Sequence, residues 1–275
     1  MASSPASRAF RRVKPVSAWR KLSLVLWPDL AHAVTTYVTS LDVTDVAAAL
    51  AKRPAETHAT WTVAWLKALE LVLVEHPRFN VFVRRGGFDT RDDVDLFLRM
   101  TLAEKNDTGL EHDSLWGAYL RGVQGDSLDA LSARLQAHRT KSRDTANRSP
   151  GLQRLVLFLP VWLLRLGVAV VRWTAHWGVE LPGVPSILFP SVSISNVGSV
   201  KTPPVVGRTT PLVGAPIHFV IGPVVQRDGR SSVELHVGFD HRLFDGPDVA
   251  AFFAALEPAL RRAVETATPS VDRQP

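Results

Sequence analysis

The stretch from residue 217 to residue 260 limits the fold of this chain more than any other part of the sequence. Apolar side chains alternate with polar or small ones from 232 to 239, which is the period of a strand with one buried face. A second apolar run, Ile217 to Val225, precedes it, and Asp228-Gly229 between the two runs is typical of a tight hairpin turn. Apolar residues at helical spacing follow Gly246. We therefore expect an antiparallel hairpin that leads directly into a helix.

The junction between this strand and this helix carries the pattern His-Arg-x-x-Asp-Gly, with His241, Asp245 and Gly246 at its fixed places. Four specified residues at this spacing arise by chance on the order of once in a thousand chains of this length. A histidine at the end of a strand is held by a rigid scaffold, where proteins often place catalytic groups. For an isolated histidine, burial against a hydrogen-bonding neighbour is the commoner role, but the surrounding motif favours catalysis.

This motif resembles the active-site motif of the coenzyme A-dependent acyltransferases. These include the catalytic domains of the dihydrolipoyl acyltransferases (E2 components) of 2-oxo acid dehydrogenase complexes, and the chloramphenicol acetyltransferases. The resemblance implies an α/β fold, a two-layer sandwich of a mixed β-sheet with helices. It also implies that His241 is the general base, that Asp245 holds an arginine in a structural ion pair, and that Gly246 closes a tight turn.

A second match lies upstream, where Ser193-Ile194-Ser195-Asn196-Val197-Gly198 is similar to the Ile-Ser-Asn-Leu-Gly strand end of the family. The resemblance implies that Ser195 donates a hydrogen bond to the oxyanion, with Asn196 as a structural neighbour. One preorganised donor of this kind supplies about 3 kcal/mol of transition-state stabilisation. Ser-Asn-x-Gly alone is ordinary turn chemistry. Its order and spacing relative to His241 favour the functional interpretation.

A weaker match is N-terminal, because residues 17–22 resemble the opening basic segment of the family. That resemblance makes Arg20 the candidate partner of Asp245, and a solvated basic arm is the alternative interpretation. The expected organisation is a disordered basic arm (1–14), a single acyltransferase domain (15–267) and a tail (268–275).

The middle of the chain alternates between strand and helix patterns, as in an α/β layered domain. The expected strands are 36–43, 80–83 and 94–102, and the expected helices are 44–52, 60–75 and 127–138. Between 108 and 126 a polar Glu-His-Asp sequence replaces the apolar run of the family, so that the family's strand is hard to trace there. The polar stretch 141–150 is expected to form a flexible loop that could act as a lid.

The largest departure from the family is the apolar segment 152–171, which contains a single charge, Arg165. A membrane-spanning helix needs about 20 apolar residues and seldom carries a central arginine. We therefore expect no spanning helix. Two alternatives remain, a buried helix at a subunit interface and a membrane-surface helix flanked by Arg154, Arg165 and Arg172.

The formal net charge of +6 suggests acidic partners, and coenzyme A with its phosphates is one. Nucleic acid is disfavoured because the sequence shows neither basic residues interleaved with aromatics nor a nucleic-acid-binding motif. The chain has no cysteine, which excludes disulfides, zinc–thiolate sites and a cysteine nucleophile and fits a reducing cytoplasm. No metal or nucleotide cofactor is expected.

The sequence thus predicts an acyltransferase that moves an acyl group between coenzyme A and a thiol such as dihydrolipoamide. The resemblance implies a homotrimer, or a larger assembly of trimers, in which His241 of one subunit faces Ser195 of the next. The sequence contains no lipoyl domain, so any lipoyl group is expected on a separate protein. The alternative is an inactive homotrimeric scaffold or binding protein of the same fold.

Overall fold

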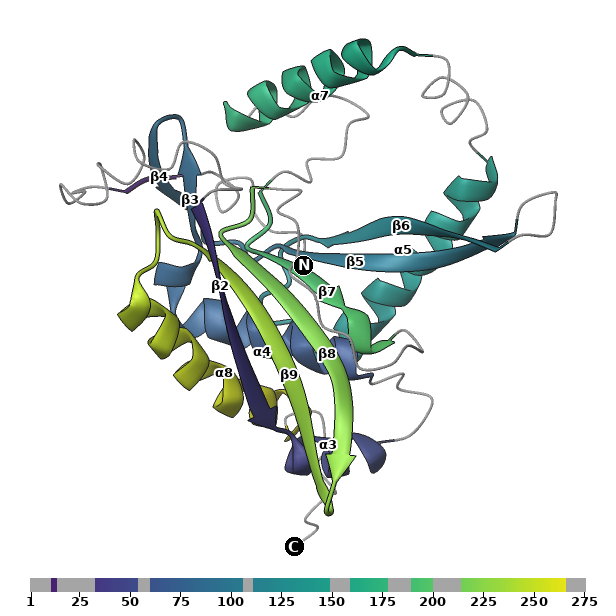
Figure 1. The fold of residues 1–275 in the computed structure, drawn as a ribbon, viewed down its shortest axis with the longest axis vertical. Helices are drawn as coiled ribbons and strands as arrows, with labels where there is room; N and C mark the ends of the chain where they lie inside the picture. Colours follow the sequence, from purple (N-terminus) through teal and green to yellow (C-terminus); the bar gives the residue numbers. More distant parts are fainter. Residues whose placement is uncertain are drawn as a thin grey trace, which may run out of the picture.

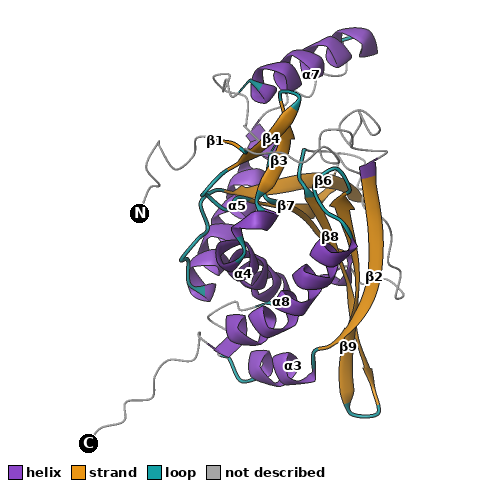
Figure 2. Cartoon of the chain, turned by 90° about the vertical axis from the view of Figure 1, so that its left-hand side faces the viewer, coloured by secondary structure: helices purple, strands orange, loops and turns teal. Residues whose placement is uncertain are grey.

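A computed structural model of the chain describes residues 11–13, 33–53, 60–105, 111–148, 159–177, 189–199 and 214–265. Its main feature is a six-stranded mixed sheet with helices against one face (Figure 1; Figure 2). The strands lie in the order β2 (Val34–Asp42), β9 (Arg230–Asp240), β8 (Ile217–Arg227), β7 (Val192–Asn196), β5 (Leu96–Lys105) and β6 (Glu111–Leu120). β7 runs parallel to both neighbours, and the other adjacent pairs are antiparallel. The expected α/β sandwich is confirmed.

The hairpin of β8 and β9 forms where the sequence predicts it. Asp228 and Gly229 both have positive φ, 49° and 76°, as a two-residue hairpin turn with the twist of the strands requires. β9 also pairs with β2 from Ser232 to Asp240, which makes it an interior strand. Helix α8 (Gly246–Glu265) begins at the last residue of the His-Arg-x-x-Asp-Gly motif and continues past Pro258.

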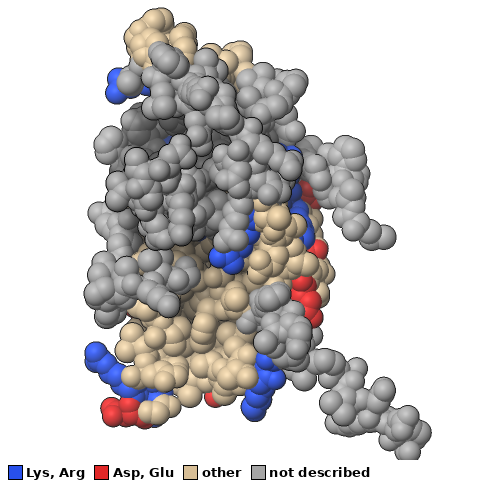
Figure 3. Space-filling model, turned by 90° about the vertical axis from the view of Figure 1, so that its right-hand side faces the viewer, with Lys and Arg blue, Asp and Glu red and all other residues tan. Residues whose placement is uncertain are grey.

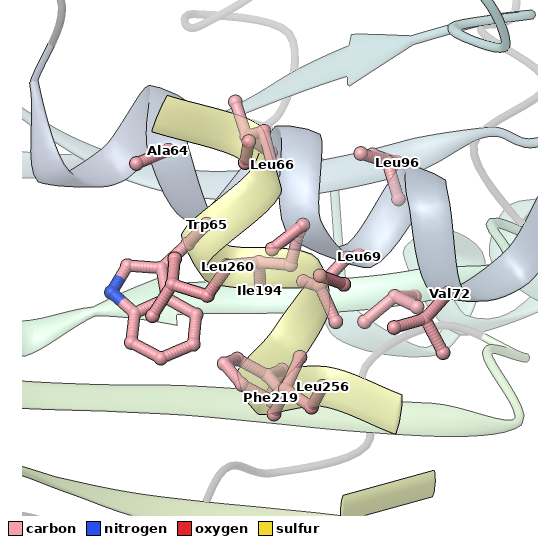
Figure 4. Packing of buried hydrophobic residues seen from close by; sticks show 14 of the residues in the cluster. Ala64, Trp65, Leu66, Leu69, Val72, Leu96, Ile194, Phe219, Leu256 and Leu260 are labelled. Atoms are coloured by element: carbon pink, nitrogen blue, oxygen red, sulfur yellow. The ribbon is translucent and has the colours of Figure 1, made fainter. Parts of the chain in front are cut away.

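The helices of the second layer are α3 (Thr44–Ala51), α4 (Trp61–Glu75), α5 (Leu128–Arg148) and α8. α4 is buried almost throughout, and its apolar side chains belong to the core shared by the sheet and α8. Figure 4 shows how its side chains pack against both: Trp65, Leu66, Leu69 and Val72 from α4, Leu256 and Leu260 from α8, and Leu96, Ile194 and Phe219 from the sheet. Each fully buried apolar side chain of this size contributes about 1.5–3 kcal/mol. This core fixes the sheet that carries the motifs.

The middle of the chain differs from the sequence-based picture at two places. Residues 111–120 form β6, which lies at the edge of the described sheet and pairs with β5. An edge strand is paired on one side, so it tolerates polar residues that an interior strand would not. Residues 141–148, expected as a flexible loop or lid, are instead the last turns of α5. The other predicted middle elements are confirmed with shifts of a few residues at their ends.

A small second sheet has the strand order β1 (Arg11–Arg12), β4 (Gly87–Thr90) and β3 (Val81–Arg84), with the 3-10 turn η2 (Pro77–Phe79) before β3. Arg11 and Arg12 were expected in a disordered arm, but both pair with β4. The fully buried carboxylate of Asp89 holds this N-terminal strand in place through Arg12, whose Nε lies 3.1 Å from Asp89 Oδ1. The other carboxylate oxygen, Oδ2, lies 3.5 Å from Arg84 Nη1 and 3.2 Å from Arg85 Nη2. Burial lowers the pKa of Arg84 to about 10.

The apolar segment after residue 152 contains helix α7 (Val161–His176), which starts just after Pro160 and ends beyond the predicted limit. The helix lies at one end of the molecule, past β3 and β4 (Figure 1). Residues 152–158 are outside the described part of the chain.

Candidate active site

The backbone around His241 is fixed by hydrogen bonds to two other segments. The N–H of Asp240 donates to the carbonyl of Pro216 at 2.9 Å, and the N–H of His241 donates to the carbonyl of Ala33 at 2.9 Å. The chain then turns sharply, since the N–H groups of Leu243 and Phe244 both donate to the carbonyl of Asp240. His241 therefore leaves the end of β9 in a defined direction.

A buried ion pair braces the same turn. Arg242 donates to Asp240 Oδ1 from Nε at 2.8 Å and to Oδ2 from Nη2 at 2.6 Å, and its backbone N–H donates to Oδ1 at 3.0 Å. Both side chains are more than nine-tenths buried. A two-point pair of this kind adds geometric precision as well as energy.

The hydrogen bond of the His241 ring defines its chemistry. Nδ1 lies 2.9 Å from the carbonyl oxygen of Phe244, which can only accept, so Nδ1 carries the proton and the basic lone pair is on Nε2. The Phe244 side chain is buried against Phe79 and Phe239, which holds that carbonyl in place. The His241 side chain is 32% exposed, enough to meet a substrate.

Asp245 lies beside the same ring nitrogen. Its Oδ1 is 3.7 Å from His241 Nδ1, too long for a hydrogen bond but close enough for its charge to stabilise a protonated imidazole. The backbone N–H of Asp245 donates to Asp248 Oδ2 at 3.1 Å, as in a helix capping box. At Gly246, which begins α8, an added Cβ would meet no heavy atom within 4 Å. Arg20, the predicted partner of Asp245, lies outside the described residues.

Ser195 and Asn196 end strand β7. Ser195 is half-buried, and Asn196 Nδ2 donates to Thr62 Oγ1 at 2.8 Å, which ties the strand end to the start of α4. The chain continues into the 3-10 turn η3 (Val197–Ser199). A Cβ at Gly198 would lie 2.4 Å from the carbonyl oxygen of Gly222, at an irregularity of β8, so the glycine of the Ser-Asn-x-Gly motif is required by close packing.

The sheet register keeps Ser195 and His241 apart within one chain. Ser195 is aligned with Val220, whereas Phe239, two residues before His241, is aligned with Ile217. At the usual rise per residue this places the two residues about 16 Å apart along the strands, and two strand spacings add about 10 Å across the sheet. A base and an oxyanion donor that act on the same carbonyl must both approach it to about 3 Å. Within one chain the two residues are therefore too far apart to act on the same carbonyl.

A polar cluster on the sheet face opposite the helices was not found by sequence reasoning. Ser193 and His218 are register neighbours on β7 and β8, both are buried, and neither the Ser193 hydroxyl nor either ring nitrogen of His218 makes a regular hydrogen bond in the described structure. Burial, reinforced by the charge of Arg99, lowers the pKa of His218 to about 4, with a small opposing effect of the Ala215 backbone. The period-2 position of His218, on the same face as Ser193 and Ser195, is the signal that could have revealed the cluster.

The comparison with known proteins gives structural matches alone. No protein-family model matches the sequence, and no curated protein matches it. The dihydrolipoamide acetyltransferase of Azotobacter vinelandii matches with a TM-score of 0.55 and 17% identity, covering 92% of this chain and 94% of that one. Its catalytic mechanism has been investigated through a serine, a histidine and an asparagine.

Two further structures match over nearly their whole length. The cubic core of a pyruvate dehydrogenase multienzyme complex has a TM-score of 0.54 and 17% identity, with 92% of this chain and 94% of that one covered. A chloramphenicol acetyltransferase has a TM-score of 0.50 and 11% identity, with coverage of 92% and 100%. The chain therefore has the fold of the dihydrolipoamide acetyltransferase catalytic cores and of chloramphenicol acetyltransferase.

Proposed function

We propose that this protein is an acyltransferase that moves an acyl group between coenzyme A and a thiol acceptor such as dihydrolipoamide. The observation that carries the proposal is the hydrogen bond from His241 Nδ1 to the Phe244 carbonyl, because it leaves the lone pair of Nε2 available as a base on a rigid turn. The fold agrees with this chemistry. In the Azotobacter enzyme the named asparagine follows the named histidine by four residues, the spacing of Asp245 from His241.

The proposed reaction needs one group that accepts and then returns a proton, and it forms no covalent enzyme intermediate. His241 Nε2 takes the proton of the acceptor thiol, and the thiolate forms a new C–S bond to the carbonyl carbon of the acyl thioester. The carbonyl electron pair moves to oxygen, and the Ser195 hydroxyl donates to the resulting oxyanion. When the C=O bond re-forms, the bond to the coenzyme A sulfur breaks. The imidazolium then returns its proton to that sulfur.

The roles of the neighbouring residues follow from their geometry. The Asp245 carboxylate, 3.7 Å from Nδ1, stabilises the imidazolium while it carries the proton. Asp240 and Arg242 hold the turn, and Asn196 holds the end of β7. We place the complete site between His241 of one subunit and Ser195 of the next, in a homotrimer or an assembly of trimers. The separation of the two residues within one chain supports this arrangement.

Release of free coenzyme A tests the proposal directly. The protein is incubated with acetyl-CoA and longer acyl-CoAs, with and without dihydrolipoamide, beside His241→Ala and the control His138→Gln on α5. We expect acceptor-dependent release that falls at least about a hundredfold in His241→Ala, the scale of losing a general base, and is unchanged in the control. Absence of both turnover and acyl-CoA binding would instead favour an inactive scaffold of the same fold.

A further inference from the structure

Helix α7 presents an apolar stripe to solvent. Its members are Trp162, Leu166, Val170, Trp173 and Trp177, the last residue lying one position past the helix end. The intervals of four, four, three and four residues place them on one face of a helix. They are five of the seven large hydrophobic residues that are exposed in the described part of the chain. The exposed apolar surface is therefore concentrated on this helix.

The exposure of this stripe is large. Trp162 is 66% exposed, Trp173 64% and Trp177 55%, whereas Thr174, adjacent to Trp173, is buried. The rings of Trp173 and Trp177 lie side by side with centroids 6.3 Å apart. A helix of 16 residues is about 24 Å long. It projects at the end of the molecule beyond the small sheet, as both ribbon views show (Figure 1; Figure 2).

The charged residues that flank α7 in the sequence have one sign. From 145 to 179 the sequence contains four arginines and no acidic residue, and Arg165 is exposed on α7 itself. In the face seen in Figure 3, the described surface at the upper end is apolar or neutral with a basic group, whereas acidic groups appear lower on the molecule. A second copy seated stripe against stripe would bring arginines together without an acid from this segment.

We propose that α7 docks this protein onto a lipid bilayer with anionic headgroups, lying in the plane of the interface with its tryptophan stripe inserted. Tryptophan, with an apolar body and a polar N–H, favours the boundary between headgroups and acyl chains. Arg165, exposed on the same helix, adds electrostatic attraction to anionic lipid. Among the described helices, none has the length and apolarity needed to cross a membrane, which agrees with a surface position. The proposal does not depend on the proposed catalytic activity.

Vesicle co-sedimentation tests it. The full chain is mixed with vesicles of phosphatidylcholine alone or with phosphatidylglycerol, beside the triple variant Trp162→Ser/Trp173→Ser/Trp177→Ser. The matched control is Val38→Ser/Val74→Ser, which removes the two other exposed large hydrophobics. We expect binding to anionic vesicles that falls at least about tenfold in the triple variant, is unchanged in the control, and weakens with added salt. Arg165→Gln should weaken it by roughly fivefold, since one arginine near the surface contributes about 1 kcal/mol.

Two further measurements keep the result unambiguous. Brominated lipids should quench the tryptophan fluorescence of the natural protein, a readout that requires no variant, and circular dichroism checks that the triple variant is folded. Equal sedimentation of the natural protein and a folded triple variant, or no quenching, would overturn the proposal. So would a triple variant whose oligomeric mass in lipid-free solution falls below that of the natural protein, because a second copy would then cover the stripe.

Discussion

The Arg242 side chain donates hydrogen bonds to both carboxylate oxygens of Asp240, so the proposed base, His241, is flanked in the sequence by the two members of a buried ion pair. Replacing one member of such a pair leaves the other charge buried and uncompensated. We expect Arg242→Met to lower the free energy of unfolding by about 3–5 kcal/mol, measured by urea denaturation. Activity should fall as well, because the turn that aims His241 loosens.

The double variant Asp240→Leu/Arg242→Met is the control for this prediction. It removes both charges, so it should recover most of the stability lost in Arg242→Met. If the single variant unfolds at the same urea concentration as the natural protein, the pair does not brace the turn.

Mixing two inactive variants tests whether the site is shared between chains. His241→Ala and Ser195→Ala should each lose about a hundredfold or more in rate. In mixed oligomers of equal amounts, about a quarter of the interfaces pair a natural His241 with a natural Ser195, provided that subunits assemble at random around a cyclic axis. Coenzyme A release should recover to that level after co-refolding. No recovery would mean that each chain builds its own site.

The buried carboxylate of Asp89 predicts a large stability loss at a position remote from the proposed chemistry. Asp89→Asn leaves Arg12, Arg84 and Arg85 without their shared counter-charge, and we expect a loss of about 3–5 kcal/mol in denaturant unfolding. Asp92→Asn is the matched control. Its partner Arg11 is on the surface, so the loss there should be below about 1 kcal/mol.

His218 predicts how stability depends on pH. The folded protein keeps its imidazole neutral with a pKa of about 4, whereas the unfolded chain titrates near 6.5, so the unfolded state takes up the proton first as the pH falls. The contribution is complete above pH 6.5 and is lost progressively down to about pH 4. The difference between the two pKa values corresponds to about 3 kcal/mol at most.

Thermal unfolding between pH 7.5 and pH 4 checks this prediction against His218→Leu. The variant has no imidazole to protonate, so its stability should fall less steeply over that interval than that of the natural protein. His236→Gln, which changes a histidine bonded to Glu234 on the same sheet, is measured beside it as the control for replacing a histidine as such. Identical slopes for the natural protein and His218→Leu would show that His218 is protonated without cost.

The sequence is informative where local chemistry and tertiary structure agree. The Asp228-Gly229 turn and the α4 apolar run each require one conformation, and both were predicted. β6 was hard to trace because an edge strand tolerates polar side chains, and the end of α5 was predicted as a loop because its sequence is polar. The ion pair of Arg12 with Asp89 joins segments that lie far apart in the sequence, so no local pattern encodes it.

The offset between Ser195 and His241 across the sheet also has a consequence for the activity of an unassembled subunit. In a lone chain, the proposed base His241 and the proposed oxyanion donor Ser195 would lie too far apart to act on one acyl group. Such a chain has little means to waste acyl-CoA by transferring its acyl group to water. Turnover per chain would then rise with protein concentration and level off as subunits associate, so that dilution alone would switch the protein off.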